Sequence, residues 1–147
     1  MGFRRARVSI KGRKGGYEPC LPSRTGAKAC CDQRIETAKN IQKREVAVTQ
    51  LVAHVHDVIE TTKLAIKGIV IGGDFNTNHD QEMFATEKTL DSLIGAGYQN
   101  GFEELPLSQR ITHPGTHGFP DAPFDFLFTR DLKASSPIVT QTNASDH

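Results

Sequence analysis

The stretch KGIVIGGDFN, residues 67–76, decides the fold class of this chain. Residues 67–71 form a short apolar run rich in β-branched side chains, which is typical of a buried strand, and the two glycines after them predict a tight turn. The strand delivers Asp74 and Asn76 to its carboxyl end, on the same side if the chain stays extended. Ligand sites in α/β proteins gather at such strand ends. The stretch therefore predicts both an α/β fold and the position of a site.

Helical periodicity flanks this strand on both sides. From Thr37 to Thr61, apolar residues recur at the spacing of an amphipathic helix with one buried stripe, formed by Ala38, Ile41, Val48, Val52, Val55 and Ile59. A second helix is predicted from Gln81 to Ile94, with four side chains pointing inward: Phe84, Leu90, Leu93 and Ile94. It should end at the glycines that follow, Gly95 and Gly97.

The remaining elements are two strands and two loops. Strands are predicted at Phe124–Phe128 and at Pro137–Gln141, and loops at residues 11–33 and 105–123, which are rich in Gly and Pro. His54 and His56, two apart on the first helix, are interpreted as surface or core-edge residues. Strands and helices that alternate in this way indicate an α/β protein.

The composition is that of one soluble globular domain. The chain has 147 residues, of which 37% are hydrophobic and 24% charged. No apolar run approaches the roughly 20 residues of a membrane span, and no apolar stretch follows the basic start, so we expect no export signal. Three cysteines, Cys20, Cys30 and Cys31, lack the spacing of a metal site and are interpreted as free thiols. The compartment and the oligomeric state stay open.

Charge is divided unevenly along the chain. Residues 1–45 hold 12 Lys and Arg against 4 Asp and Glu, a net of +8, and residues 46–147 hold 6 against 13, a net of −7, which together give +1. This asymmetry is compatible with a phosphate-facing surface beside a metal-attracting one. On charge alone, a solvated basic tail is the simpler interpretation of the first part.

Chemistry is expected first at Asp74 and Asn76. A carboxylate and an amide at a strand end can activate water and hold a phosphoryl oxygen. Alternate residues from Asp74 to Asp80 also imitate the start of an EF-hand calcium loop. The sixth position of that loop would be His79 instead of glycine and the twelfth Ala85 instead of glutamate, and a strand precedes it. The calcium-loop interpretation is therefore rejected.

The second chemical element is Asp125, an acid inside the apolar strand FDFLF. A carboxylate between aromatic residues needs a cation or a hydrogen-bond donor. The sequence SDH, which ends in Asp146 and His147, offers an imidazole. A carboxylate that orients a histidine is the arrangement that general acid–base chemistry needs, although a buried stabilising pair would look the same.

These motifs in this order resemble the endonuclease/exonuclease/phosphatase (DNase I-like) superfamily: a strand ending in GDFN, then FDFLF, then SDH. The segment from Ile111 to Phe126 also resembles the loop before the penultimate family motif. The resemblance runs from about Asn40 to His147. It implies a four-layer α/β sandwich and a hydrolase of phosphoester bonds that depends on Mg²⁺ or Mn²⁺.

The resemblance also implies roles for individual residues. Asp74 would position or deprotonate the attacking water and lie at the metal, and Asn76 would hydrogen-bond a phosphate oxygen. His147 would bind a phosphate oxygen or transfer a proton, held by Asp125. Asp146 would lie at the metal, usually Mg²⁺, which neutralises charge on the phosphoryl group.

Other family motifs are not matched. The glutamate that is the family's principal metal ligand has no counterpart, and of a His-x-Lys-Ser motif only Lys11 remains, as a candidate substrate-binding residue. We therefore divide the chain into a basic, loop-rich segment of uncertain homology, residues 1–36, and the C-terminal part of a superfamily domain, residues 37–147. The first strands and the last strand of the sandwich would be missing, so we expect a truncated fragment with weak metal affinity and little or no turnover alone.

Two classes of function follow. The leading hypothesis is a metal-dependent phosphodiesterase, nuclease or phosphatase whose substrate, DNA, RNA, lipid or inositol phosphate, stays open. The basic first third favours nucleic acid weakly, through phosphate neutralisation. The alternative is a non-catalytic remnant of the fold that binds a phosphate-bearing ligand or nucleic acid.

Overall fold

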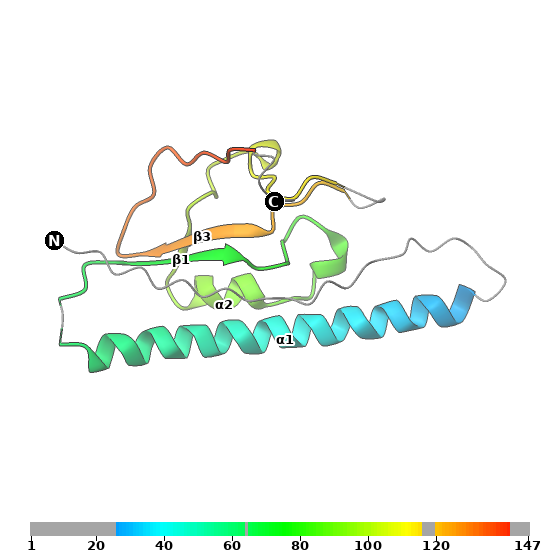
Figure 1. The fold of residues 1–147 in the computed structure, drawn as a ribbon, viewed down its shortest axis with the longest axis horizontal. Coiled ribbons are helices and arrows are strands. Elements are labelled where there is room, and N and C mark those ends of the chain that lie inside the picture. The colour runs from blue at the N-terminus through cyan, green and yellow to red at the C-terminus, as the bar shows by residue number, and fades with distance from the viewer. Residues whose placement is uncertain (1–25, 64, 116–119, 142–147) are drawn as a thin grey trace.

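The computed structural model describes residues 26–63, 65–115 and 120–141. These residues form a mixed α/β unit, which confirms the predicted class (Figure 1). Its elements, in chain order, are α1 (Gly26–Thr61), β1 (Ile69–Asp74), the 3-10 helix η1 (Glu82–Phe84), α2 (Thr89–Gly95), β2 (Gln99–Asn100), the 3-10 helix η2 (Leu107–Gln109) and β3 (Asp125–Arg130).

Helix α1 is longer than its periodicity predicted. It begins at Gly26, so the last part of the predicted loop 11–33 is helical, and the predicted boundary after residue 36 falls inside the helix. Residues 27–36 contain neither Gly nor Pro, and continuing a helix through them costs little. Val48 is buried as predicted, while His54 and His56 are exposed. No helix among the described residues is long and apolar enough to span a bilayer.

The three strands form one antiparallel sheet in the order β1-β3-β2. Strand β1 pairs with β3 from Ile69, opposite Arg130, to Asp74, opposite Asp125. The tight turn predicted at the two glycines is wrong, because β1 runs straight through them. The expected burial of this strand is also wrong: only Ile71 is buried, since β1 lies at the edge of the described sheet.

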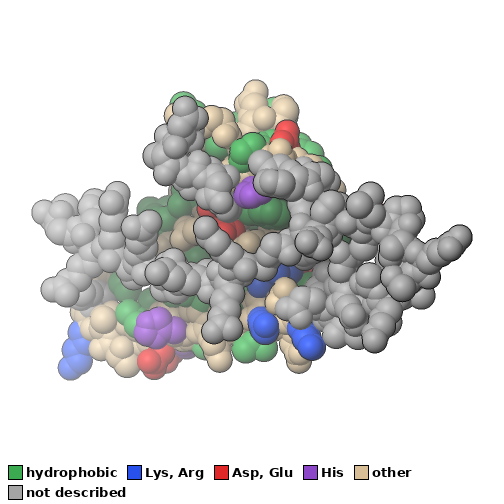
Figure 2. Space-filling view, turned by 45° about the vertical axis from the view of Figure 1, so that its right-hand side comes forward, with side chains coloured by type: hydrophobic (Ala, Val, Ile, Leu, Met, Phe, Trp, Pro, Cys, Tyr) green, Lys and Arg blue, Asp and Glu red, His purple; other side chains and the backbone are tan. Residues whose placement is uncertain are grey.

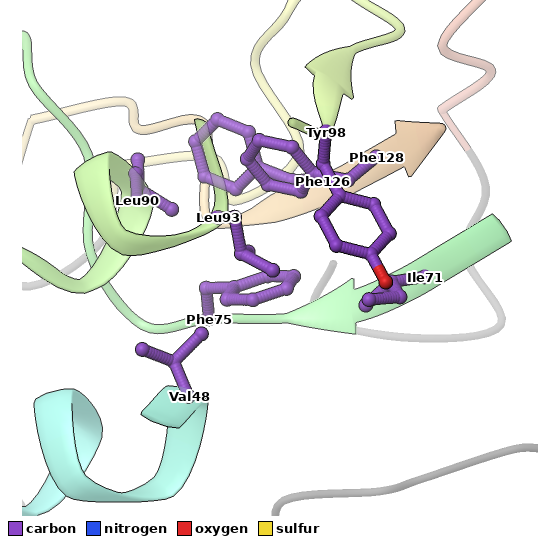
Figure 3. Close-up of a cluster of buried hydrophobic side chains, with 8 residues drawn as sticks. All are labelled: Val48, Ile71, Phe75, Leu90, Leu93, Tyr98, Phe126 and Phe128. Atoms are coloured by element: carbon purple, nitrogen blue, oxygen red, sulfur yellow. The ribbon is translucent and has the colours of Figure 1, made fainter. Parts of the chain in front are cut away.

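One face of the sheet packs against both helices. Figure 3 shows Val48 of α1 beneath Phe75, and Leu93 of α2 between Phe75 and the rings of Phe126 and Phe128, all in one buried cluster. The Phe75 ring meets Phe126 and Phe128 edge to face, with centroids 5.9 and 5.6 Å apart. Because side chains alternate across a strand, the neighbours of these residues project from the opposite face of the sheet.

The second predicted helix is broken. The structure replaces Gln81–Ile94 with η1 and α2, and the turn between them directs the buried Glu87 toward α1. Gly97 has a φ of +84°, as expected for a glycine that ends a helix. Ile94, the last residue but one of α2, is 51% exposed instead of inward.

Two further predictions about strands need correction. Residues 137–141 lie in neither a strand nor a helix, and Ile138 is 79% exposed. In its place, the two-residue strand β2 pairs with Thr129 and Phe128 of β3. The predicted strand at 124–128 is confirmed as β3, shifted by one to two residues.

Candidate active site

Asp74 and Asp125 are direct partners across the β1–β3 ladder. The Phe75 N–H donates to the Phe124 oxygen at 2.8 Å in the next pair along the ladder. Hydrogen-bonded and non-hydrogen-bonded pairs alternate between antiparallel strands, so Asp74 and Asp125 form a non-hydrogen-bonded pair, with Cα atoms about 4.5 Å apart. Their side chains project from the same face, away from the helices. Two carboxylates that the sequence separates by 51 positions are thus brought together.

Asn76 is held against Asp74. Its backbone N–H donates to Asp74 Oδ1 and its side-chain Nδ2 donates to Asp74 Oδ2, each at 2.8 Å. The extended chain assumed from the sequence does not persist, since Asn76 has a φ of +52° in the left-handed region, which Asn tolerates better than most residues. The two side chains nevertheless meet. An amide nitrogen carries two N–H bonds, so the second remains able to donate to a ligand oxygen.

Thr112 supports the start of β3, and sequence analysis did not single it out. Its side chain is buried, and its Oγ1 accepts hydrogen bonds from the backbone N–H groups of Phe124 and Asp125, both at 3.0 Å. The adjacent residue His113 forms an isolated bridge with Ala122. The sequence feature that could have pointed to Thr112 is its position in the loop before FDFLF, which resembles the corresponding loop of the family.

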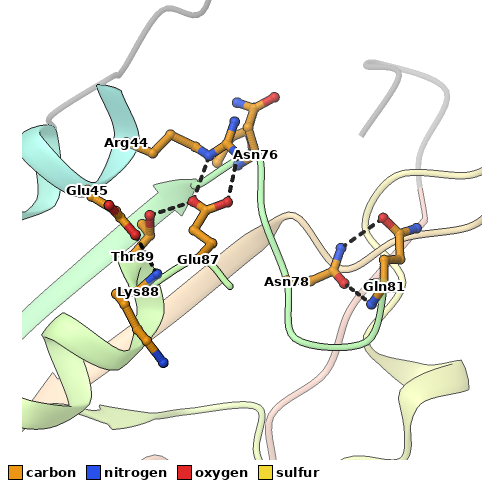
Figure 4. Close-up of polar contacts among 9 residues, drawn as sticks. Arg44, Glu45, Asn76, Asn78, Gln81, Glu87, Lys88 and Thr89 are labelled. Carbon is orange, nitrogen blue, oxygen red and sulfur yellow. Dashed lines mark hydrogen bonds and ion pairs between the residues drawn. The ribbon is translucent and has the colours of Figure 1, made fainter. Parts of the chain in front are cut away.

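The loop after Asn76 is fixed by Asn78, which is fully buried. Its Oδ1 accepts from the backbone N–H groups of Asp80 and Gln81, at 2.9 and 3.0 Å, and Nδ2 donates to the Gln81 side chain (Figure 4). In an EF-hand loop this oxygen would face a calcium ion. Here it satisfies backbone donors at the start of η1, in agreement with the rejection of that motif.

A buried ion pair joins α1 to the segment that follows the site. The Arg44 guanidinium donates to both oxygens of Glu87, at 2.8 and 2.7 Å, and lies over the Phe84 ring (Figure 4). Thr89 donates a further hydrogen bond to Glu87. Sequence analysis did not select Arg44, although it lies one turn before Val48 on the buried stripe. That position was the signal for its burial.

The far end of the sheet carries another cation and aromatic pair. The Arg130 guanidinium lies 4.9 Å from the centroid of the Tyr98 ring. Burial raises the pKa of Tyr98 above its usual 10.0, and the nearby positive charge of Arg130 opposes part of this rise. This end is separated from the aspartates by the length of β3.

Three predicted site residues, Lys11, Asp146 and His147, lie outside the described residues, so the pairing of Asp125 with His147 stays a prediction. Within the described part of the chain, no group of three or more His, Cys, Asp or Glu side chains could hold a metal ion. The donor chemistry nevertheless fits Mg²⁺, which prefers oxygen ligands, keeps several waters and often takes only one or two carboxylates.

The surface around the sheet has mixed charge. Figure 2 shows acidic and histidine side chains next to one another near the centre of one face, with Lys and Arg side chains below them.

Comparison with known proteins adds no relative. No protein-family model, curated protein or solved structure matches the chain.

Proposed function

We propose that the chain is a metal-dependent hydrolase of phosphoester bonds, of the endonuclease/exonuclease/phosphatase type. The observation that carries this proposal is the register of β1 and β3, which sets Asp74 opposite Asp125 at the strand end where Asn76 turns back. The GDFN and FDFLF motifs lie far apart in sequence and supply one pair of carboxylates on one face. A shared site explains why both strands carry an acid at this position.

Two carboxylates side by side on one face offer the oxygen ligands that a divalent cation such as Mg²⁺ prefers. Like charges directly opposite one another in an antiparallel ladder destabilise it, and a positive charge between or beside them removes the repulsion. Asp74, with Asp146 by resemblance, would hold Mg²⁺ or Mn²⁺. When bound, the ion would neutralise charge that develops on the phosphoryl group.

The chain's own residues would perform the remaining tasks. Asp74 accepts a hydrogen bond from Asn76 at each of its two oxygens, and its carboxylate would orient the attacking water molecule. Asn76 would donate its second amide N–H to a phosphoryl oxygen. Asp125 would orient His147, which would contact a phosphate oxygen or transfer a proton.

The architecture is compatible with half of the four-layer sandwich that the resemblance implies. Helices cover one face of the described sheet, and the other face carries Val70, 53% exposed, as well as both aspartates. A second sheet would pack on this other face. We propose that arrangement as the context in which the site works.

The proposal is tested by hydrolysis of bis(p-nitrophenyl) phosphate by the 147-residue chain with Mn²⁺ or Mg²⁺. We expect slow turnover that requires the metal and falls by at least about a hundredfold in Asp74→Asn, because a water-positioning group is removed. Asp57→Asn, at an exposed site on α1, is the control that should retain the rate. Binding of the diester without any turnover would favour a non-catalytic phosphate-binding or nucleic-acid-binding protein, and the absence of both would refute the proposal.

A further inference from the structure

We propose that Thr112 is a positioning residue, whose hydroxyl holds Asp125 in register opposite Asp74. The register itself needs no assumption about activity; only the effect on cation binding depends on the proposed function. Thr112 lies in the loop before the FDFLF motif, and its hydroxyl contacts the backbone of the site residue Asp125 and of the preceding Phe124.

The direction of the Asp125 N–H follows from the way β3 pairs with β1. In a non-hydrogen-bonded antiparallel pair, the N–H groups of both residues point away from the partner strand. The N–H of Asp125 therefore points away from β1. Thr112 Oγ1 occupies that side and accepts this hydrogen bond together with the one from Phe124, at 3.0 Å each.

Phe124 is thereby held from both sides. Its oxygen accepts the Phe75 N–H from the β1 side at 2.8 Å, and its N–H donates to Thr112 on the other. Strand β2 pairs only with the distal residues Phe128 and Thr129, so it gives no ladder support at this end of β3. Thr112 supplies that support with a side chain.

The loop holds the hydroxyl in place. The Thr112 N–H donates to the Ala122 oxygen at 3.1 Å, and His113 exchanges two hydrogen bonds of 2.9 Å with the same residue. Thr112 is only 8% exposed, so water cannot easily replace its hydroxyl. Removing the hydroxyl would leave two poorly solvated donors, which favours local opening of the strand end. Asp125 would then move away from Asp74.

The test compares Thr112→Val, which keeps the shape and removes the acceptor, with Thr112→Ser, which keeps the hydroxyl. Thr129→Val is the matched control, because it makes the same change at another buried threonine, one that lies in β3 itself. The first readout is the Hα–Hα nuclear Overhauser effect between Asp74 and Asp125, a signature of non-hydrogen-bonded pairs. The same effect between Gly72 and Leu127, the next such pair, reports whether the rest of the sheet stays folded.

We expect Thr112→Val to lose the Asp74–Asp125 effect and to retain the Gly72–Leu127 effect, whereas Thr112→Ser and Thr129→Val keep both. The second readout is the dissociation constant for Mn²⁺, which should rise at least about fivefold in Thr112→Val and recover in Thr112→Ser.

Each other outcome has a distinct meaning. If Thr112→Val keeps the Asp74–Asp125 effect, or if Mn²⁺ binds this variant as tightly as the unchanged chain, the positioning role is refuted. Loss of both Overhauser effects would mean that Thr112 supports the whole sheet, and this also overturns the proposal. If the unchanged chain shows the Asp74–Asp125 effect but binds no Mn²⁺, the proposed function fails. The Overhauser effects in Thr112→Val then still decide whether Thr112 holds the register.

Discussion

Asp74 and Asp125 face one another across the β1–β3 ladder as a non-hydrogen-bonded pair. The same register places their neighbours Phe75 and Phe126 in the core on the opposite face. Core packing thus fixes the two carboxylates on one surface without any direct attraction between them. The arrangement is electrostatically unfavourable unless a positive group lies close by.

Two substitutions can distinguish what the left-handed backbone at Asn76 contributes to stability from what its side chain contributes. Asn76→Ala and Asn76→Gly both remove the hydrogen bond from Nδ2 to Asp74, but only alanine strains the φ of +52°. We expect the glycine variant to be the more stable by about 1 kcal/mol in urea unfolding, because the strain exceeds the backbone entropy that glycine adds to the unfolded state. An alanine variant as stable as the glycine variant would contradict this assignment.

Substitution of Arg44 should lower the free energy of unfolding more than substitution of its partner Glu87. Arg44→Met leaves the Glu87 carboxylate, whose side chain is 2% exposed, without its ion-pair partner. The expected loss in the free energy of unfolding is about 3–5 kcal/mol. Glu87→Gln should cost less, since Arg44 is 17% exposed and keeps its position over Phe84. Denaturant unfolding measures both, with exposed Lys43→Met as a control within about 0.5 kcal/mol. Equal losses in the two variants would show that Glu87 is not effectively buried.

Alkaline pH should weaken the fold through Tyr98. Burial raises its pKa above 10.0, so an unfolded chain loses this proton at a lower pH than the folded one. The free energy of unfolding should therefore fall as pH rises above 10.0 and through the raised pKa, and be unaffected by this group below 10.0. In urea unfolding as a function of pH, Tyr98→Phe should lack this part of the decline. If the free energy of unfolding declines with pH in the same way in Tyr98→Phe and in the unchanged chain, Tyr98 does not cause the decline.

The sequence predicted those features that depend on local periodicity. The strands around Ile71 and Phe126 and the burial of Val48 are confirmed, because β-branched runs, alternation and helical spacing are local signals. The continuation of β1 through Gly72 and Gly73 was not predicted. Glycine is compatible with a turn or a strand, and pairing with β3, 50 or more residues away, decides between them.

The sequence indicated which residues form the candidate site better than it indicated how they are arranged. Asp74, Asn76 and Asp125 could be selected as chemical residues, yet their meeting depends on a strand register that no local pattern specifies. Thr112 escaped selection because it acts on backbone N–H groups, and any loop threonine has the same sequence appearance. Arg44 escaped because a charged residue on a buried stripe is expected to face solvent until its partner is known.

The most direct measurement is the pattern of amide signals that substoichiometric Mn²⁺ broadens in the NMR spectrum of the 147-residue chain. We predict the strongest broadening at Asp74 to Asn76 and at Asp125, with affinity at least about tenfold lower in Asp74→Asn. Broadening centred elsewhere, for instance at the exposed neighbours Glu103 and Glu104, or unchanged affinity in Asp74→Asn, would contradict the assignment of the cation to the paired aspartates.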